Sequence, residues 1–394
     1  MLSVLEPSPA DPILQLAADF RADPRTQKLD LGVGVYKDSA GATVIPRAVK
    51  QAEARLLETQ DSKSYLGLLG DVAFSHAMAS LVLGDDAPED RLATIQTAGG
   101  SGALWILFSL VKVARPDATV WVSSPTWSNH KAIAAGAGLP SREYAYFDYA
   151  TRSVDFDRMV SDLKAAGPGD VVLLHGCCHN PTGANLTLAE WKTITEMALA
   201  QGFTPMIDLA YQGFGDGLAE DASGVRHLAA HAPEVLIAAS CSKNFALYRD
   251  RTGAAIVLTS DPKTAGAAEA NLKTLMRSSI SMPPDHGAAA ARLILTTPDL
   301  RTTWEAELTE MRTRMLSLRE ALADALRTRC NSDRFDFIAR HRGMFSLMGA
   351  TPEQVDRLRE ERGIYLIRDS RLNVAGLKED RIEEVADAFA AIGI

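Results

Sequence analysis

The stretch VLIAASCSKNFALYRDRTGAAIVLTS, residues 235–260, places two apolar runs on either side of a polar loop that contains Lys243. Similar short apolar runs begin at Val120, Val171 and Pro205. Because their hydrophobicity is continuous rather than alternating, these runs are typical of strands buried on both faces of a mainly parallel sheet. Helical patterns lie between or around them, at residues 45–57, 187–200 and 262–276. The sequence therefore predicts an α/β fold whose mainly parallel sheet is flanked by helices.

The C-terminal part of the chain predicts a second, smaller domain of the α+β class. A long helical pattern at residues 302–328 leads into the short segments FDFIAR, GMFSLMG and IYLIRDS, and an amphipathic pattern at residues 380–391 follows. We expect the N-terminal segment to pack with this part. The predicted domains are residues 41–314 for the large domain, and residues 1–40 together with 315–394 for the small one.

Composition limits the class of protein. With 394 residues, 46% of them hydrophobic and 23% charged, the chain resembles globular proteins that bury a sizeable core. A net charge of -9 offers no basic stripe for a nucleic-acid backbone, so we expect no nucleic-acid partner. The N-terminal segment does not resemble a secretory signal, and no apolar segment is long enough to span a bilayer. The 4 cysteines are interpreted as free thiols in a reducing compartment, which indicates a cytoplasmic protein.

Lys243 follows the apolar run that begins at Val235, and the carboxyl ends of such strands are where open α/β sheets bind ligands. Partial removal from water lowers the pKa of a lysine there and lets its amine form and exchange Schiff bases. A surface lysine just past a strand is the alternative that this segment alone leaves open.

Asp208 ends another apolar run in the segment PMIDLAYQGF, with Tyr211 three residues later. A carboxylate in such surroundings needs a cationic or hydrogen-bonding partner, since burying it alone is costly. The protonated ring nitrogen of a cofactor such as pyridoxal phosphate is one suitable partner. A helix N-cap or an internal ion pair would satisfy the carboxylate equally well.

The segment TAGGSGALWILF, which begins at Thr97, is a glycine-rich turn before a helical pattern. Exposed N–H groups at the start of a helix, together with the Ser101 hydroxyl, form a possible phosphate cradle. Ser240 and Arg251 could reach the same phosphate, although either residue could belong to an ordinary loop. The segment does not match the glycine patterns of nicotinamide binding, of nucleophile-elbow hydrolases or of Walker nucleotide sites.

The segment HGCCHNPTG, residues 175–183, follows the run that begins at Val171. Its Asn-Pro-Thr-Gly turn can present the Asn180 side chain sharply, so that the amide can donate to a ring oxygen of a cofactor. His175 and His179 flank two adjacent cysteines, but the sequence shows no carboxylate or further ligand that completes a metal site. We therefore expect no metal, and interpret both histidines as structural or supporting residues.

Taken together, these segments resemble the class I, fold-type I pyridoxal-phosphate-dependent aminotransferases, within the subgroup that acts on aspartate and aromatic amino acids. The resemblance covers nearly the whole chain. It rests on DPILQLAADFRADPRTQKLDLGVGVYKD, SKSYLGLLG, TAGGSGAL, PTWSNH, HGCCHNPTG, DLAYQGF, SKNFALYRDRTG, GMFSL and SRLNVAGL, in that order. The order of so many segments makes the resemblance specific.

The resemblance implies a role for each matching residue of the cofactor site. Lys243 corresponds to the lysine that forms the internal aldimine and moves the proton. Asp208 corresponds to the partner of the pyridine nitrogen, with His130 and His175 behind it. The remaining residues implied to contact the cofactor are Asn180 and Tyr211 at the ring oxygen, Trp127 on the ring face, and Gly100, Ser101, Ser240 and Arg251 at the phosphate. Tyr65 is implied to reach the phosphate from the other subunit of a homodimer.

The resemblance also implies the residues that bind the substrate. Arg371 matches the arginine that grips the α-carboxylate, and Gly34 lies in the segment that closes over the substrate. Trp127 and Asn180 are implied to contact the substrate as well. Arg277 matches the arginine that binds a distal carboxylate from the partner subunit. This chain departs from the aspartate-specific pattern, because Met282 stands where an asparagine is usual and Ser64 stands where another is usual.

From these departures we expect dual specificity, since a thioether offers adaptable apolar surface to an aromatic ring. The expected reaction is ping-pong transamination between aromatic amino acids, or aspartate, and 2-oxoglutarate. A strict aspartate aminotransferase remains an alternative. So does a different reaction of the same cofactor, such as β-decarboxylation or lyase chemistry, because fold alone does not decide function. A non-catalytic ligand-binding module is a further alternative, and the filled lysine position disfavours it.

Overall fold

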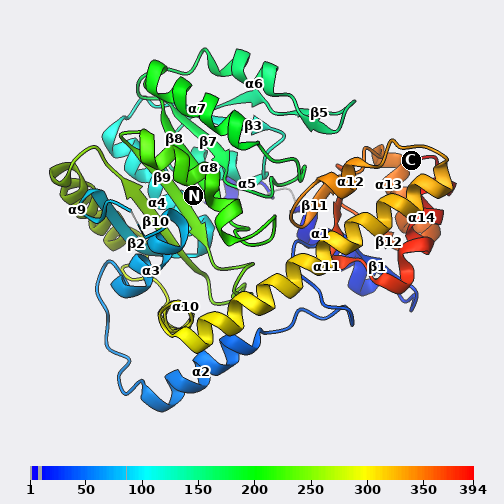
Figure 1. Cartoon of the computed structure of the whole chain (residues 1–394), viewed down its shortest axis with the longest axis horizontal. Helices are drawn as coiled ribbons and strands as arrows, with labels where there is room; N and C mark the ends of the chain where they lie inside the picture. The colour runs from blue at the N-terminus through cyan, green and yellow to red at the C-terminus, as the bar shows by residue number, and fades with distance from the viewer. Residues whose placement is uncertain (1, 8–10, 86) are drawn as a thin grey trace. The chain divides into compact units, whose positions relative to one another are not determined.

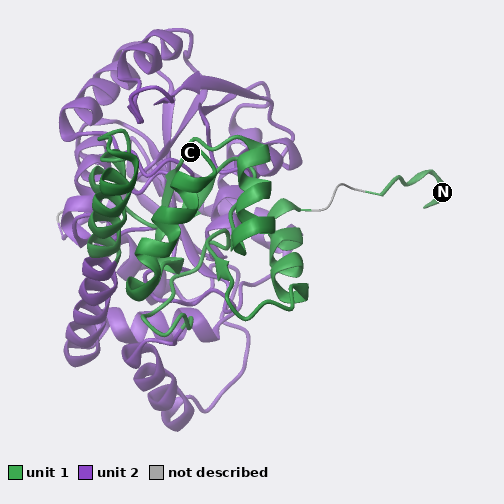
Figure 2. Ribbon diagram, turned by 90° about the vertical axis from the view of Figure 1, so that its right-hand side faces the viewer, with its two compact units in different colours: residues 1–43, 315–394 green, residues 44–314 purple. Residues whose placement is uncertain are grey.

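The computed structural model describes residues 2–7, 11–85 and 87–394. The chain forms two compact units, which Figure 2 colours separately: unit 1 contains residues 1–43 and 315–394, and unit 2 contains residues 44–314. Each unit is described by itself below. The predicted domain limits, at residues 40 and 314, refer to independently folding domains. They stay predictions.

Within the described residues, unit 2 is built on a seven-stranded sheet (Figure 1). In spatial order its strands are β2 (Leu92–Ala98), β10 (Thr252–Leu258), β9 (Val235–Ser240), β8 (Thr204–Leu209), β7 (Val171–His175), β3 (Val120–Ser124) and β4 (Ser141–Ala145). The strands from β9 to β4 are parallel to their neighbours, whereas β10 is antiparallel to both β9 and β2. The prediction of a mainly parallel sheet is therefore confirmed.

The burial of these strands explains their sequence pattern. All residues of β7, β9 and β10 are buried, so both faces of each strand are covered, and no alternation of polar and apolar residues is needed. β10 has the same continuous pattern although it is antiparallel, which shows that the pattern reports coverage by helices rather than strand direction. A short antiparallel pair, β5 (Phe147–Asp148) and β6 (Ser153–Val154), lies outside this sheet.

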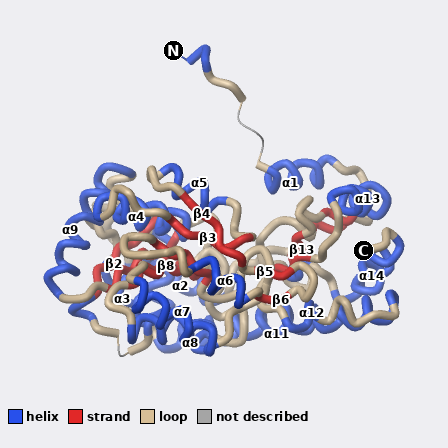
Figure 3. The backbone as a smooth tube through the Cα atoms, turned by 90° about the horizontal axis from the view of Figure 1, so that it is seen from above, coloured by secondary structure: helices blue, strands red, loops and turns tan. Residues whose placement is uncertain are grey.

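Helices cover both faces of the sheet of unit 2. Figure 3 shows α4 and α5 on one side and α3, α7 and α8 on the other. The helices are α2 (Arg47–Thr59), α3 (Val72–Leu83), α4 (Gly99–Ala114), α5 (Asn129–Gly136), α6 (Phe156–Leu163), α7 (Leu188–Gln201), α8 (Leu218–His231), α9 (Pro262–Ser279) and α10 (His286–Thr296). In α7 the local signals are clear: Thr187 and Glu190 form a capping box, and Gly202 ends the helix in a left-handed conformation.

Helix α11 (Pro298–Cys330) begins in unit 2 and ends in unit 1. Unit 1 also contains α1 (Pro12–Ala22), α12 (Phe337–Arg340), α13 (Pro352–Arg362) and α14 (Ile382–Ala391). Its strands are short: β1 (Leu29–Asp30) pairs with β12 (Ile364–Tyr365), and β11 (Phe345–Leu347) pairs with β13 (Arg371–Asn373). Single 3-10 turns are Leu2–Val4, Glu89–Arg91, Val374–Gly376 and Glu379–Arg381. The predicted α+β character of this part is observed.

Among the described residues, no helix combines the length and the apolar composition that crossing a bilayer requires.

Candidate active site

Several polar side chains meet at one edge of the sheet of unit 2. His175 is the last residue of β7, and in the register of the sheet it stands opposite Asp208 of β8. Ser240 is the last residue of β9. Because these strands are parallel, their carboxyl ends lie at the same edge, which is where open α/β sheets bind ligands. The structure therefore brings together strand ends that are more than thirty residues apart in sequence.

Asp208 is nearly buried at this edge, with 9% of its surface exposed. Its Oδ2 atom lies 3.0 Å from Nε2 of His130, which is fully buried. Burial by itself would raise the pKa of the Asp208 carboxyl. The hydrogen bond from His130, and the electrostatic interactions with His130, His175 and Lys243, outweigh burial and hold that pKa below its ordinary value. The site thus keeps a buried negative charge at neutral pH.

A chain of hydrogen bonds runs away from this carboxylate. The Thr126 hydroxyl lies 2.8 Å from Nδ1 of His130 and 3.2 Å from Nε2 of His175. The backbone N–H of Asn180 donates to Nδ1 of His175 at 3.4 Å. Burial, followed by the neighbouring His130, lowers the pKa of His175 to about 3, so His175 is neutral.

Only one arrangement of protons satisfies the whole chain. The Asn180 N–H occupies Nδ1 of His175, so a neutral His175 carries its proton on Nε2 and donates to Thr126. Thr126 then gives its single hydrogen to Nδ1 of His130, and His130 donates from Nε2 to Asp208. Every donor in the chain points toward the carboxylate.

Lys243 lies in the loop that follows β9. Its Nζ atom is 5.2 Å from the centre of the Tyr211 ring, and its charge contributes to the low pKa of Asp208. Lys243 therefore lies near Tyr211 and interacts electrostatically with Asp208. Tyr211 and Asn180 are both buried, with 6% and 7% of their surfaces exposed.

Two contacts hold the lysine loop. The side-chain amide of Asn244 donates to the carbonyl of Gln212 at 3.2 Å, which ties the residue after Lys243 to the residue after Tyr211. On the other side, the indole N–H of Trp304 donates to the carbonyl of Asn244 at 2.8 Å. Because Lys243 and Tyr211 precede these anchored residues directly, the positions of the amine and of the phenol depend on each other.

A second group of predicted residues converges where α4 begins directly after β2. A Cβ atom on Gly99 would lie 2.7 Å from Nη2 of Arg251, and one on Gly100 would lie 3.0 Å from Cβ of Ser240. Ser101 lies in the first turn of the helix, and Ala98 provides no side-chain cap. The absence of side chains on Gly99 and Gly100 therefore lets the Arg251 guanidinium and the Ser240 side chain lie close against the start of the helix. Such an arrangement suits a phosphate.

Trp127 is half-buried beside His130. Its ring meets the ring of His130 edge to face, with centroids 5.2 Å apart and an interplanar angle of 88°. The side chain therefore borders the hydrogen-bonded chain at His130.

In unit 1, the predicted residue Arg371 contacts the segment 32–35, which contains the predicted Gly34. The guanidinium of Arg371 stacks on the Phe345 ring at 4.4 Å and donates to the carbonyl of Gly32 at 3.2 Å. A Cβ atom on Gly34 would lie 3.0 Å from Cζ of Phe345, so the absence of a side chain lets this segment approach the ring. Asn373 donates to the carbonyls of Val33 and Val35, at 2.7 and 2.9 Å.

Tyr65 and Arg277, which the resemblance assigns to the partner subunit, are exposed in this single chain, and 91% of the Tyr65 surface is accessible. The backbone N–H of Leu66 lies 3.2 Å from the sulfur of Met282. The methionine that replaces the usual asparagine therefore contacts the residue next to Tyr65.

The structure corrects one detail of the sequence analysis. Cys177, Cys178 and the carboxylate of Asp221 offer atoms within 4.8 Å of one another, so a carboxylate does accompany the adjacent cysteines. The sequence concealed it because Asp221 comes from α8. Its two oxygens already accept the backbone N–H groups of Gly213, Gly215 and Asp216, at 2.8 to 2.9 Å. The neighbouring Cys178 thiol and burial raise the pKa of Cys177, and a neutral thiol is a poor metal ligand.

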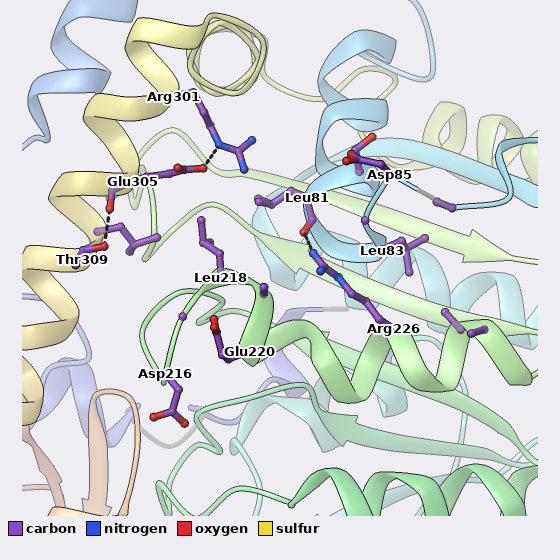
Figure 4. Close-up of a pocket in the computed structure, with 18 of the residues that line it drawn as sticks. Leu81, Leu83, Asp85, Asp216, Leu218, Glu220, Arg226, Arg301, Glu305 and Thr309 are labelled. Carbon is purple, nitrogen blue, oxygen red and sulfur yellow. Dashed lines mark hydrogen bonds and ion pairs between the residues drawn. The ribbon is translucent and has the colours of Figure 1, made fainter.

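A cavity of about 850 Å³ in unit 2 is distinct from these groups (Figure 4). Its described lining comes from α3, α8, α11 and nearby loops, and includes none of the predicted site residues. Arg226 there donates to the carbonyls of Leu81 and Val82, and Arg301 pairs with Glu305. Because none of the predicted site residues lines it, this cavity is not the predicted cofactor site.

Sequence reasoning missed three residues of these networks. Thr126 lies within the quoted segment PTWSNH and Asn373 within SRLNVAGL, but neither was assigned a role. Arg319 is fully buried in unit 1 and donates to the carbonyls of Gly343 and Phe345, both at distances below 3 Å. An arginine inside an amphipathic helix gives no signal in the sequence that distinguishes it from an exposed one.

Comparisons with known proteins agree with the resemblance. A family model described as "Aminotransferase class I and II" matches residues 26–389. The chain is 54% identical to the aromatic-amino-acid aminotransferase of Paracoccus denitrificans over 394 residues, which is 100% of both chains. It is 43% identical to the aspartate aminotransferase of Escherichia coli (strain K12) over 395 residues, again 100% of both.

A solved structure provides the corresponding comparison of folds. The aromatic-amino-acid aminotransferase of Burkholderia pseudomallei, covalently bound to pyridoxal phosphate, matches with a TM-score of 0.97 and 41% identity. The match covers 100% of this chain and 99% of that chain. The predicted fold class and the predicted family are confirmed.

Proposed function

This chain belongs to the class I and II aminotransferases, and on that premise we propose that it transfers amino groups between aromatic amino acids, or aspartate, and 2-oxoglutarate. The relatives named for aromatic amino acids and for aspartate support both substrate classes. We propose that the reaction proceeds as two half-reactions on one site, which is the ping-pong scheme expected from the sequence.

The proposed cofactor is pyridoxal phosphate, which supplies an electron sink when it is bound. The residues of unit 2 fit it at each end. Asp208 offers a buried negative charge for a protonated ring nitrogen, and Lys243 offers an amine beside that charge. Gly99 and Gly100 let Ser240 and Arg251 approach the N-terminus of α4 closely, and this grouping suits the phosphate. Asn180 and Tyr211 are proposed to donate to the ring oxygen.

The hydrogen-bonded residues and Lys243 are proposed to have different roles in the reaction. The ordered hydrogen bonds from Asn180 to Asp208 are proposed to keep the Asp208 carboxylate charged, because the N–H of His130 donates to it. A carboxylate held in this way favours a proton on the ring nitrogen opposite it. With the cofactor bound, Lys243 would take the proton from the substrate Cα at its Nζ atom and deliver it to C4′ of the cofactor, across the nitrogen that joins the two carbons.

The substrate carboxylate is proposed to bind Arg371. The stacking on Phe345 and the hydrogen bond to Gly32 hold one face and one edge of the guanidinium, which orients it for bidentate contact with a carboxylate. Gly34 is proposed to close over the substrate, and Trp127 to pack against its ring or that of the cofactor.

Specificity for the distal group is proposed to depend on a homodimer, in which Arg277 and Tyr65 of each chain serve the site of the other. The exposure of both residues in the single chain supports this arrangement. Met282 is proposed to let Arg277 move aside for an aromatic substrate. The proposed location is the cytoplasm, which the free thiols of Cys177, Cys178 and Cys241 support.

The observation that carries the proposal is the proximity of Lys243 to a buried, charged Asp208. A half-reaction titration tests it: aspartate, glutamate, tyrosine and phenylalanine are each added to the purified protein without an oxo-acid acceptor. We expect each to convert the bound cofactor to its amine form with stoichiometric release of the oxo acid. Conversion by aspartate and glutamate alone would refute dual specificity, and conversion by none would refute the proposed function.

A further inference from the structure

His179 is a fully enclosed imidazole beside the hydrogen-bonded chain, and the proposed reaction gives it no role. Only 1% of its surface is exposed. Its ring stacks on Tyr146, with centroids 4.0 Å apart and an interplanar angle of 12°. On its other face lies the ring of His175, also at 4.0 Å, with an angle of 33°. The ring of His179 therefore restricts the orientation of the His175 ring.

Both nitrogens of His179 face hydroxyl groups. Nε2 lies 2.9 Å from Oγ of Ser123, and Nδ1 lies 3.0 Å from Oγ1 of Thr182. The Ser123 hydroxyl donates its hydrogen to the carbonyl of Pro125 at 2.9 Å, so it can only accept from His179. The Thr182 oxygen accepts the backbone N–H of Ala184 and has its own hydrogen available for Nδ1. These bonds select a neutral His179 with its proton on Nε2.

The backbone of His179 closes the turn that carries Asn180. The N–H of Gly183 donates to the carbonyl of His179 at 2.7 Å, and the N–H of His179 donates to Oδ1 of Asn185 at 3.3 Å. Through its side chain the same residue reaches Ser123, whose hydroxyl is bonded to the residue before Thr126. One imidazole thus connects the segment of Thr126 with the turn of Asn180.

We propose that His179 is a positioning residue for transamination: it fixes the plane of His175 and joins the Thr126 and Asn180 segments, so that the hydrogen bonds ending at Asp208 keep their order. This inference rests on the proposed function, and assigns His179 to the ring-binding side of the same site. His179 touches neither substrate nor cofactor in it. Its contribution passes through His175 and Asn180.

Two substitutions separate the two kinds of contact. His179→Phe keeps a ring between Tyr146 and His175 but removes both hydrogen bonds, whereas His179→Gln keeps an N–H that reaches Ser123 but removes the ring. Thr195→Val is the control, because it removes a buried hydrogen bond of unit 2, from Thr195 to the carbonyl of Trp191, outside this network. Thermal unfolding of each variant identifies any that fails to fold.

The first measurement is the pH titration of the visible absorbance band of the cofactor-loaded protein. We expect His179→Phe to move the midpoint to higher pH by roughly half a unit, because Asn180 then holds the ring oxygen less well. We also expect kcat/KM to fall about tenfold, less than the ~100-fold cost of a 1 Å misplacement. Thr195→Val should change neither quantity. A midpoint and a kcat/KM unchanged in both His179 variants would overturn the proposal.

The second measurement needs no cofactor. In the apo wild-type protein labelled with ¹⁵N-histidine, NMR should show His179 neutral at pH 7, with a protonated Nε2 and a bare Nδ1. In His179→Phe the signals of His175 should lose their single tautomer. A cationic His179, or one protonated on Nδ1, would overturn the proposal even if no variant folds. Absence of a half-reaction in the wild-type protein contradicts the proposed function instead, and the NMR result still decides the role of His179.

Discussion

Unit 2 and unit 1 both hold charged side chains out of water, but they stabilise them differently. In unit 2 the Asp208 carboxylate receives a hydrogen bond from His130, whose proton order is set by Thr126 and His175. In unit 1 the buried guanidiniums point at backbone oxygens: Arg319 donates to several carbonyls and to the Ser346 hydroxyl. Unit 2 thus stabilises its buried charge with side chains, whose identities can be read from the sequence. Unit 1 stabilises its buried charge with backbone carbonyls, whose positions cannot be read from the sequence.

The two units also differ in how their strands position the site residues. In unit 2 the register of strands of five to seven residues places His175, Asp208 and Ser240 at one edge. In unit 1 the strands contain two or three residues, and Arg371 and Asn373 are positioned by their own bonds to the segment 32–35. We therefore expect a substitution at a site residue of unit 2 to lower the rate of the reaction. A substitution at a buried residue of unit 1 should instead disturb the positions of its neighbours.

The largest expected effect is that of Lys243→Ala. Without the amine the proton transfer loses its acid and base, which alone accounts for a rate factor of about 10²–10⁴, and the covalent link to the cofactor is lost as well. Single-turnover kinetics with glutamate should show at least this loss. A variant with a normal cofactor absorbance band and normal turnover would contradict the assignment of Lys243.

Asp208→Asn should have the next largest effect. It removes the charge but keeps the shape and an acceptor for His130, so the fold should persist while turnover falls by about 100-fold or more. The thermal unfolding temperature of the apo variant, compared with wild type, checks that the loss is chemical. Equal turnover in both proteins would show that the charge at this position is not needed.

Arg319→Met tests the opposite behaviour in unit 1. It leaves several buried carbonyls without donors, and we expect it to lower the free energy of unfolding by about 3 kcal/mol. The matched control is Arg357→Met, which removes an exposed pair with Glu361 on α13 and should cost less than about 1 kcal/mol. Urea unfolding of the three proteins gives the comparison. If the two variants lowered the free energy of unfolding by similar amounts, the buried contacts of Arg319 would not stabilise unit 1 in the way described.

Arg371→Lys should act mainly on substrate binding. A lysine keeps the charge but loses the bidentate fork and the planar stacking on Phe345, which we expect to raise KM for every amino acid substrate about 10- to 100-fold. Steady-state kinetics with glutamate and with phenylalanine measure this. If the increase were confined to dicarboxylates, Arg371 would bind the distal group instead.

The smallest expected effect concerns pH. His175 has a folded pKa of about 3, below the ordinary value of 6.5, so its contribution to stability is complete above pH 6.5 and declines as the pH falls toward 3. Between pH 7 and 5 this residue should account for a loss of about 2 kcal/mol. His175→Gln, unfolded in urea at both values, should show a smaller decline than wild type. An equal decline in both proteins would assign it to other groups.

The residues that sequence reasoning identified share a visible feature. Lys243, Asp208 and His175 follow or end continuous apolar runs, so the sheet predicted their edge and the register confirmed that His175 and Asp208 are neighbours. Some predicted helices and strands are shorter than the observed ones, or begin and end at different residues. For example, α11 extends from Pro298 to Cys330, because Pro298 provides a helix start that the apolar pattern does not contain.

The remaining contacts depend on the folded backbone. Thr126 bridges two histidines that are forty-five residues apart in sequence, and Arg319 finds its carbonyls in a loop beyond the end of its own helix. Neither contact leaves a periodic pattern in the sequence. Asp221 is a similar case, since its carboxylate turns back to backbone N–H groups of the loop before α8.

The most direct test of the central claim is to locate the covalent bond to the cofactor. The holoenzyme is reduced with borohydride, which makes the imine bond between lysine and pyridoxal phosphate permanent, and is then digested and analysed by mass spectrometry. We predict that the phosphopyridoxyl mass is found on Lys243 alone, in the peptide that continues into Asn244 and Phe245. A label on another lysine, or no label on a protein that carries out the half-reaction, would contradict the account.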